Sequence, residues 1–122
     1  MRHKKNTLIL GRKAAPRRAL LRTLAISLIE QEKIQTTQAK ARAVRRLVEP
    51  LITKAKKKDV HSIRQIEKKL ANKTATMKVV NTLGPRFEKR PGGYTSIVHV
   101  APRQGDGAKQ VILKFVTSLL YD

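Results

Sequence analysis

Residues 84–116 have the sequence GPRFEKRPGGYTSIVHVAPRQGDGAKQVILKFV, in which a helical pattern gives way to an extended one. The stretches Tyr94–Val100 and Lys109–Val116 are rich in β-branched residues and predict two strands. Between them, Ala101–Gly107 contains proline, glycine and aspartate, so the strands are expected to form an antiparallel hairpin. Gly105-Asp106-Gly107 is interpreted as part of this turn, because it lacks the Gly-Lys-Ser/Thr ending of a phosphate-binding loop.

Upstream of the hairpin, apolar residues recur at helical spacing. A first helix is predicted at about 16–32, with Pro16 at its first position, where a missing N–H costs nothing. Thr37 is expected to cap a second helix, whose apolar stripe stays in phase through Pro50 and therefore favours one kinked helix over two. The segment Lys33–Thr36 between these helices predicts a short strand.

Two further helices are predicted before the hairpin. Asp59 is expected to cap a third helix at about 60–72, and Thr74 a fourth, shorter one. Gly84-Pro85 is expected to end the fourth helix. Its predicted inward-facing residues are Met77, Val80 and Leu83.

These elements predict an α+β fold with two layers, in which the helices pack on a small sheet. The expected organisation is an extended basic arm at 1–15, a single α+β domain at 16–116 and a tail at 117–122. The order within the domain is a helix, a short strand, three helices and a β-hairpin.

The charge of the chain predicts its class of partner. Lys and Arg number 28 against 8 Asp and Glu, for a formal net charge of +20, and residues 1–29 contain no acid. So strong a charge on a small body repels itself, and nucleic acid is the commonest polyanion that offsets such repulsion. The arm is expected to be disordered in the free protein and to become ordered on RNA. No apolar run is long enough for a membrane-spanning helix, and the absence of cysteine excludes disulfides.

Residues that would support catalysis are scarce. His3, His61 and His99 have no carboxylate at a metal-ligand offset, and the carboxylates are scattered among basic residues. The sequence therefore predicts a protein that is not an enzyme and needs no cofactor or metal.

Candidate RNA contacts are basic side chains, with one glycine pair. Arginine can bind a phosphate through two parallel hydrogen bonds, and Gly92-Gly93 allows a close backbone approach to a ribose-phosphate chain. Tyr94 offers a ring either for stacking or for core packing, and core packing is favoured. The predicted nucleic-acid-binding residues are Arg2, His3, Lys4, Lys5, Arg12, Lys13, Arg17, Arg18, Arg22, Lys40, Arg42, Arg46, Arg86, Arg90, Gly92, Gly93, Tyr94 and Arg103.

Several motifs in this order resemble one known family, that of the bacterial-type seventeenth protein of the large ribosomal subunit. They are Met1-Arg2-His3, Arg18-Ala19-Leu20-Leu21-Arg22 with Leu24, Ile34 with Thr36-Thr37, Ala39-Lys40-Ala41, Leu51-Ile52-Thr53 with Ala55-Lys56, and Pro85-Arg86 leading to Arg90-Pro91-Gly92-Gly93-Tyr94-Thr95. The resemblance covers about residues 1–116. It implies an α+β body whose short first strand joins the hairpin, and a structural component of the large subunit that binds its ribosomal RNA. It also implies a place near the exit of the polypeptide tunnel, beside neighbouring ribosomal proteins.

Two other partner classes stay open at this point. A nucleoid-type DNA-binding protein would present one basic face, whereas the bases here are spread over several helices. A membrane-surface or secreted defence peptide would carry a strong amphipathic helix, a signal peptide and usually cysteines. The sequence also favours a bacterial cytoplasm over an imported precursor, with an organellar ribosome left open.

Overall fold

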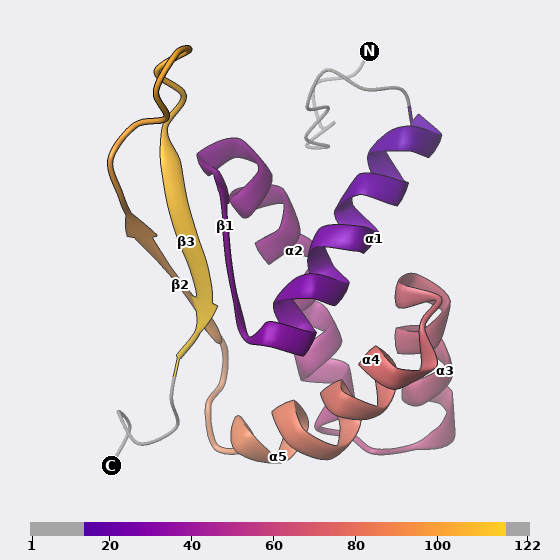
Figure 1. Ribbon diagram of the computed structural model, residues 1–122. Helices are drawn as coiled ribbons and strands as arrows, with labels where there is room; N and C mark the ends of the chain where they lie inside the picture. Colours follow the sequence, from indigo (N-terminus) through magenta and orange to yellow (C-terminus); the bar gives the residue numbers. More distant parts are fainter. Residues whose placement is uncertain (1–13, 117–122) are drawn as a thin grey trace, which may run out of the picture.

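The computed structural model describes residues 14–116, which form helices and a small sheet (Figure 1). The elements in chain order are α1 (Ala14–Gln31), β1 (Lys33–Thr37), α2 (Gln38–Ala55), α3 (Val60–Leu70), α4 (Lys73–Lys78), the π-helical turn η1 (Val79–Leu83), α5 (Gly84–Arg86), β2 (Thr95–His99) and β3 (Gln110–Phe115). The α+β prediction is therefore confirmed.

The sheet has three antiparallel strands in the order β1-β3-β2. The predicted hairpin pairs β2 with β3, and the short first strand pairs with the other edge of β3, so that Leu113 lies opposite both Ile34 and Ile97. Alternate residues of β3 are buried, namely Val111, Leu113 and Phe115. This alternation places one face of the sheet on the core and leaves the other to solvent.

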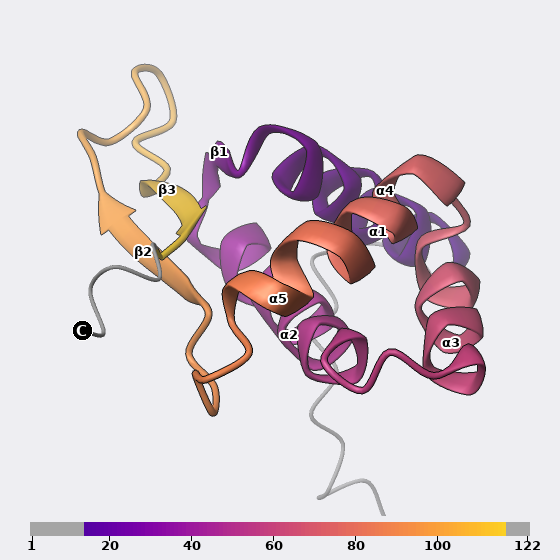
Figure 2. The ribbon, with the colours of Figure 1, turned by 90° about the horizontal axis from the view of Figure 1, so that it is seen from below.

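Helix α2 is the centre of the fold. It contacts all three strands on one side, while α1 and α3 pack against it elsewhere. Figures 1 and 2 show the sheet at one side of the molecule and α3 at the opposite side, with α2 between them. The helices thus do not form one layer on the sheet, because α3 packs on α1, α2 and α4.

Local capping explains where two of the helices begin. The side chain of Thr37 accepts a hydrogen bond from the Lys40 N–H at the start of α2, and Asp59 accepts one of 2.7 Å from the Ser62 N–H at the start of α3. Both predicted caps are confirmed. Pro50 lies inside α2, so the prediction of one helix across this proline is confirmed.

Helix α1 begins earlier than expected. It starts at Ala14, so Pro16 is its third residue and the arm predicted at 1–15 overlaps the helix by two residues. The first turn tolerates this proline because its N–H groups have no partner within the helix. The remainder of the predicted arm and the tail at 117–122 lie outside the described residues.

Three predictions about the fourth helix are wrong. The cap of α4 is Asn72, not Thr74. Asn72 Oδ1 accepts a 2.8 Å hydrogen bond from the Ala75 N–H, and asparagine is as good a cap as threonine. Met77, predicted to face inward, is 44% exposed, whereas Val80 and Leu83 are buried as predicted, together with Val79.

Gly84-Pro85 also does not end the helical segment. The chain passes through η1 into α5, with Gly84 in right-handed helical conformation. A Cβ at Gly84 would lie 3.3 Å from both the Cβ and the carbonyl oxygen of Ala55, so the glycine serves a close approach to α2 rather than a helix stop.

Candidate nucleic-acid interface

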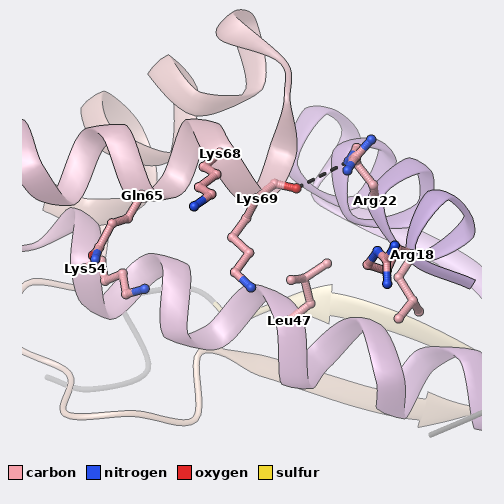
Figure 3. Close-up of a pocket in the computed structure, with 8 residues that line it drawn as sticks. Arg18, Arg22, Leu47, Lys54, Gln65, Lys68 and Lys69 are labelled. Carbon is pink, nitrogen blue, oxygen red and sulfur yellow. Dashed lines mark hydrogen bonds between the residues drawn. The ribbon is translucent and has the colours of Figure 1, made fainter. Parts of the chain in front are cut away.

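A basic groove lies where α1, α2 and α3 meet (Figure 3). The cavity has a volume of about 430 Å³, and none of its lining residues is acidic. Five of the eight lining residues carry a positive charge. The lining residues are Arg18, Leu21, Arg22, Leu47, Lys54, Gln65, Lys68 and Lys69.

Helical geometry brings these side chains together. Arg18 and Arg22 lie one turn apart on α1, and Lys68 and Lys69 lie in the last turn of α3, where positive charge complements the helix dipole. Figure 3 shows Lys69 extending from α3 toward α2, and Arg22 Nε donating a 3.4 Å hydrogen bond to the Lys69 carbonyl. Because like charges this close repel one another, the groove is suited to an anion.

A second, shallower hollow lies on α2 beside the loop before β2. Its volume is about 730 Å³, and its basic residues are Arg45, Arg46, Lys54 and Lys57. Lys54 lines both cavities, so the hollow adjoins the groove along α2. The other lining residues are Glu49, Pro50, Thr53, Gly92 and Tyr94.

The carboxylate of that hollow is engaged by the protein itself. Glu49 Oε2 accepts hydrogen bonds from the backbone N–H of Thr95 at 3.1 Å and from its hydroxyl at 2.7 Å. It also lies 3.7 Å from Nε of Arg45. These bonds tie β2 to α2 and draw part of the negative charge away from an incoming anion.

Two more side chains, Thr53 in α2 and Lys56 just after it, hold the loop in place. The Lys56 ammonium donates to the Arg90 carbonyl at 2.6 Å and to the Tyr94 hydroxyl at 3.0 Å, and it lies 5.2 Å from the centre of the Tyr94 ring. The Thr53 hydroxyl is 3.1 Å from that of Tyr94. Lys56 is the C-cap of α2 and follows Glu49 and Thr53 on the same face of the helix, and we call these three residues the α2 clamp.

Tyr94 belongs to the core. Its side chain is 1% exposed, and its ring lies 5.2 Å from that of Phe87. The preference for core packing is therefore confirmed. A ring this buried has no face on which a base could stack.

Two predicted arginines already hold a carboxylate. Arg86 binds both oxygens of Glu32, at 2.6 and 3.0 Å, and this pair lowers the pKa of Glu32. Arg103 pairs with Asp106 across the tip of the hairpin, which lowers the pKa of Asp106 to about 2. RNA contacts by these two arginines stay a prediction, and such contacts would have to compete with or share the carboxylates.

The structure gathers only part of the predicted set. Arg18 and Arg22 line the groove, and Arg46, Gly92 and Tyr94 line the hollow. Neither cavity includes the following predicted residues: Arg17, Lys40, Arg42, Arg86, Arg90, Gly93 and Arg103. The predicted contacts Arg2, His3, Lys4, Lys5, Arg12 and Lys13 lie outside the described residues.

Some lining residues were not predicted. The missed residues are Arg45 and Lys54 on α2, Lys57 in the turn after it, and Gln65, Lys68 and Lys69 on α3. A sequence signal existed for Lys54, which follows the apolar Leu47 by two helical turns and so shares its side of α2. For Lys68 and Lys69 the decisive fact is the packing of α3 on α1, which no local pattern states.

Other functions find little support in the described chain. Between residues 14 and 116 there is no group of three or more His, Asp or Glu side chains that could hold a metal ion. Over the same range, no helix is both long enough and apolar enough to cross a membrane. What the groove and hollow can do chemically is bind anions.

Comparison with known proteins gives one consistent family. The family model described as ribosomal protein L17 matches residues 20–116. The large ribosomal subunit protein bL17 of Solibacter usitatus is 50% identical over 120 residues, which cover 98% of this chain and 80% of that protein. Those of Gemmatimonas aurantiaca and Aliarcobacter butzleri are 46% and 43% identical, over 97% and 95% of this chain and the whole of each relative.

Proposed function

The chain belongs to the ribosomal protein L17 family, and we propose that it binds ribosomal RNA through the basic groove between α1, α2 and α3. Its role is that of a structural protein of the large ribosomal subunit, not of an enzyme. Its partners are ribosomal RNA and neighbouring ribosomal proteins, in a ribosome of the bacterial type. No observation favours the DNA-binding alternative.

One observation carries the assignment of the groove. Five cationic side chains from three helices surround a single cavity whose lining contains no carboxylate. Folding brings these charges together at a cost in repulsion, and neutralising phosphates offsets that cost while releasing counterions. Phosphate contacts of this kind fix position and orientation without reading sequence.

The segment before α1 extends this surface in our proposal. Residues 1–13 contain five Lys or Arg and no acid, and they lead into α1 four residues before the groove residue Arg18. We propose that this segment anchors the protein to RNA and becomes ordered there. Deletion of residues 1–13, which leaves α1 intact, should weaken RNA binding and flatten its dependence on salt.

The groove is tested by removing two of its charges. In R18Q/K69Q both substituted side chains are exposed, and the Arg22 bond to α3 is kept. Binding to a large-subunit rRNA fragment would be measured by fluorescence anisotropy over a range of salt concentrations. Each phosphate contact contributes about 0.7 to 0.9 to the slope of log K against log salt, the values for single strands and for B-form DNA, so the slope should fall by about 1.4–1.8.

A variant with the same charge change provides the control. Lys33 and Lys114 face each other on the outer surface of the sheet and line neither cavity. K33Q/K114Q should change the slope much less than R18Q/K69Q. If the two double variants behave alike, binding depends on net charge alone and the groove has no special role.

A further inference from the structure

The groove and the hollow lie on adjoining sides of one exposed strip of α2. Leu47 lines only the groove, Arg46 and Thr53 line only the hollow, and Lys54 lines both. At 100° per residue Leu47 is separated around the helix from Arg46 and Thr53, and Pro50 and Lys54 lie between them. We call the strip of Pro50 and Lys54 the α2 ridge. An anionic ligand that fills both cavities must therefore span this ridge.

The described surface offers no aromatic platform for bases. Phe87, Tyr94 and Phe115 are the Phe and Tyr residues between positions 14 and 116, where there is no Trp, and their side chains are 1%, 1% and 6% exposed. The exposed His61 and His99 line neither cavity. Proteins that bind single-stranded nucleic acid usually stack bases on exposed rings. This surface instead favours a ligand whose bases are already paired and stacked.

We propose that the α2 ridge lies in the minor groove of an A-form RNA helix, with one strand's phosphates in the basic groove and the other strand's in the hollow. This inference rests on the proposed function. An α-helix with its side chains is about 10–12 Å wide, and the minor groove of RNA is wide and shallow. The minor groove of B-DNA, at about 6 Å, is too narrow to admit it.

The α2 clamp gives the hollow a fixed wall. Glu49, Thr53 and Lys56 hold the Arg90–Thr95 segment against α2 through the bonds described above. Gly92, which lies in that wall, has open space where a Cβ would be. A ribose-phosphate strand can therefore approach the backbone closely on this side.

The test compares three nucleic acids against the full chain. They are an RNA hairpin with a stem of about 12 base pairs, the DNA hairpin of the same sequence, and an unpaired RNA of the same length. Anisotropy at fixed salt should give the RNA hairpin the tightest binding, by about tenfold or more. R45Q/K57Q removes two charges of the hollow and should abolish most of this preference, whereas K33Q/K114Q should preserve it.

The outcomes separate this inference from the function on which it rests. One outcome is that R18Q/K69Q weakens binding of every RNA, while the unmodified chain binds the DNA hairpin or the unpaired RNA as tightly as the RNA hairpin. Docking in the minor groove is then wrong, and the groove assignment stands. If R45Q/K57Q keeps the full preference for the RNA hairpin, the hollow is not the second phosphate site. If R18Q/K69Q affects no RNA, the proposed function itself fails. Thermal unfolding of each variant by circular dichroism verifies that it is folded.

Discussion

Lys56 and Lys57 are neighbours in a run of three lysines, yet the structure gives them different roles. Lys56 is half-buried and donates two hydrogen bonds, whereas the side chain of Lys57 is exposed. Replacing Lys56 with methionine keeps an unbranched side chain, one atom shorter, and removes the ammonium. The Arg90 carbonyl then loses its bond from Lys56, and the Tyr94 hydroxyl loses one of its two hydrogen-bond partners and keeps Thr53.

The expected cost follows from these contacts. A hydrogen bond with a charged partner contributes about 1.5–3 kcal/mol, and a cation–π contact about 0.5–1 kcal/mol. Part of this is regained because the methionine side chain has no charge to desolvate, so we expect K56M to lose about 2 kcal/mol of unfolding free energy. For a chain of this size that lowers Tm by about 8 °C. K57M, at an exposed position, should stay within about 0.5 kcal/mol of the unmodified chain.

Urea unfolding followed by circular dichroism measures both variants. Hydrogen exchange adds a local readout, since amides of the Arg90–Thr95 segment should exchange faster in K56M than in K57M. Equal stability of the two variants would show that Lys56 does not hold the loop, and the α2 clamp would have to be discarded.

Three further changes test other parts of the fold. N72A removes the cap of α4 and should cost about 1 kcal/mol in urea unfolding, while N72S should cost little. G84A gains about 1 kcal/mol of helix propensity, but its Cβ would lie 3.3 Å from Ala55. Overpacking of this kind costs about 1–3 kcal/mol, so thermal unfolding should show G84A to be less stable than the unmodified chain. Arg86 lowers the pKa of Glu32, so the stabilisation from this pair is complete above the ordinary glutamate pKa and is lost as the pH falls through the lowered value. E32Q should remove this part of the acid dependence of the unfolding free energy, measured from pH 7 downward.

The parts of the fold that depend on local chemistry were predictable. Thr37 and Asp59 cap helices through bonds to residues three positions away, which a sequence pattern states directly. The fourth helix was not predictable in the same way. Gly84 suggests a helix end, but its lack of a side chain serves contact with Ala55 on another helix, and only the tertiary structure shows this.

The same distinction between local and tertiary signals applies to the candidate site. Arg18 and Arg22 were identified because they lie on one helix in an acid-free part of the chain. Lys69 was missed because its place depends on how α3 crosses α1. Arg86 was predicted to bind RNA without knowledge of Glu32, which lies 54 positions earlier in the chain. Pairing over such a distance has no local signal.

Release from the large subunit by salt tests the central claim most directly. Ribosomal large subunits assembled with the unmodified chain, with R18Q/K69Q or with K33Q/K114Q would be sedimented at rising salt, and the protein remaining in the pellet measured. We predict that R18Q/K69Q leaves the subunit at distinctly lower salt than the other two. Release of all three at the same salt concentration would contradict the claim that the groove between α1, α2 and α3 holds this protein on ribosomal RNA.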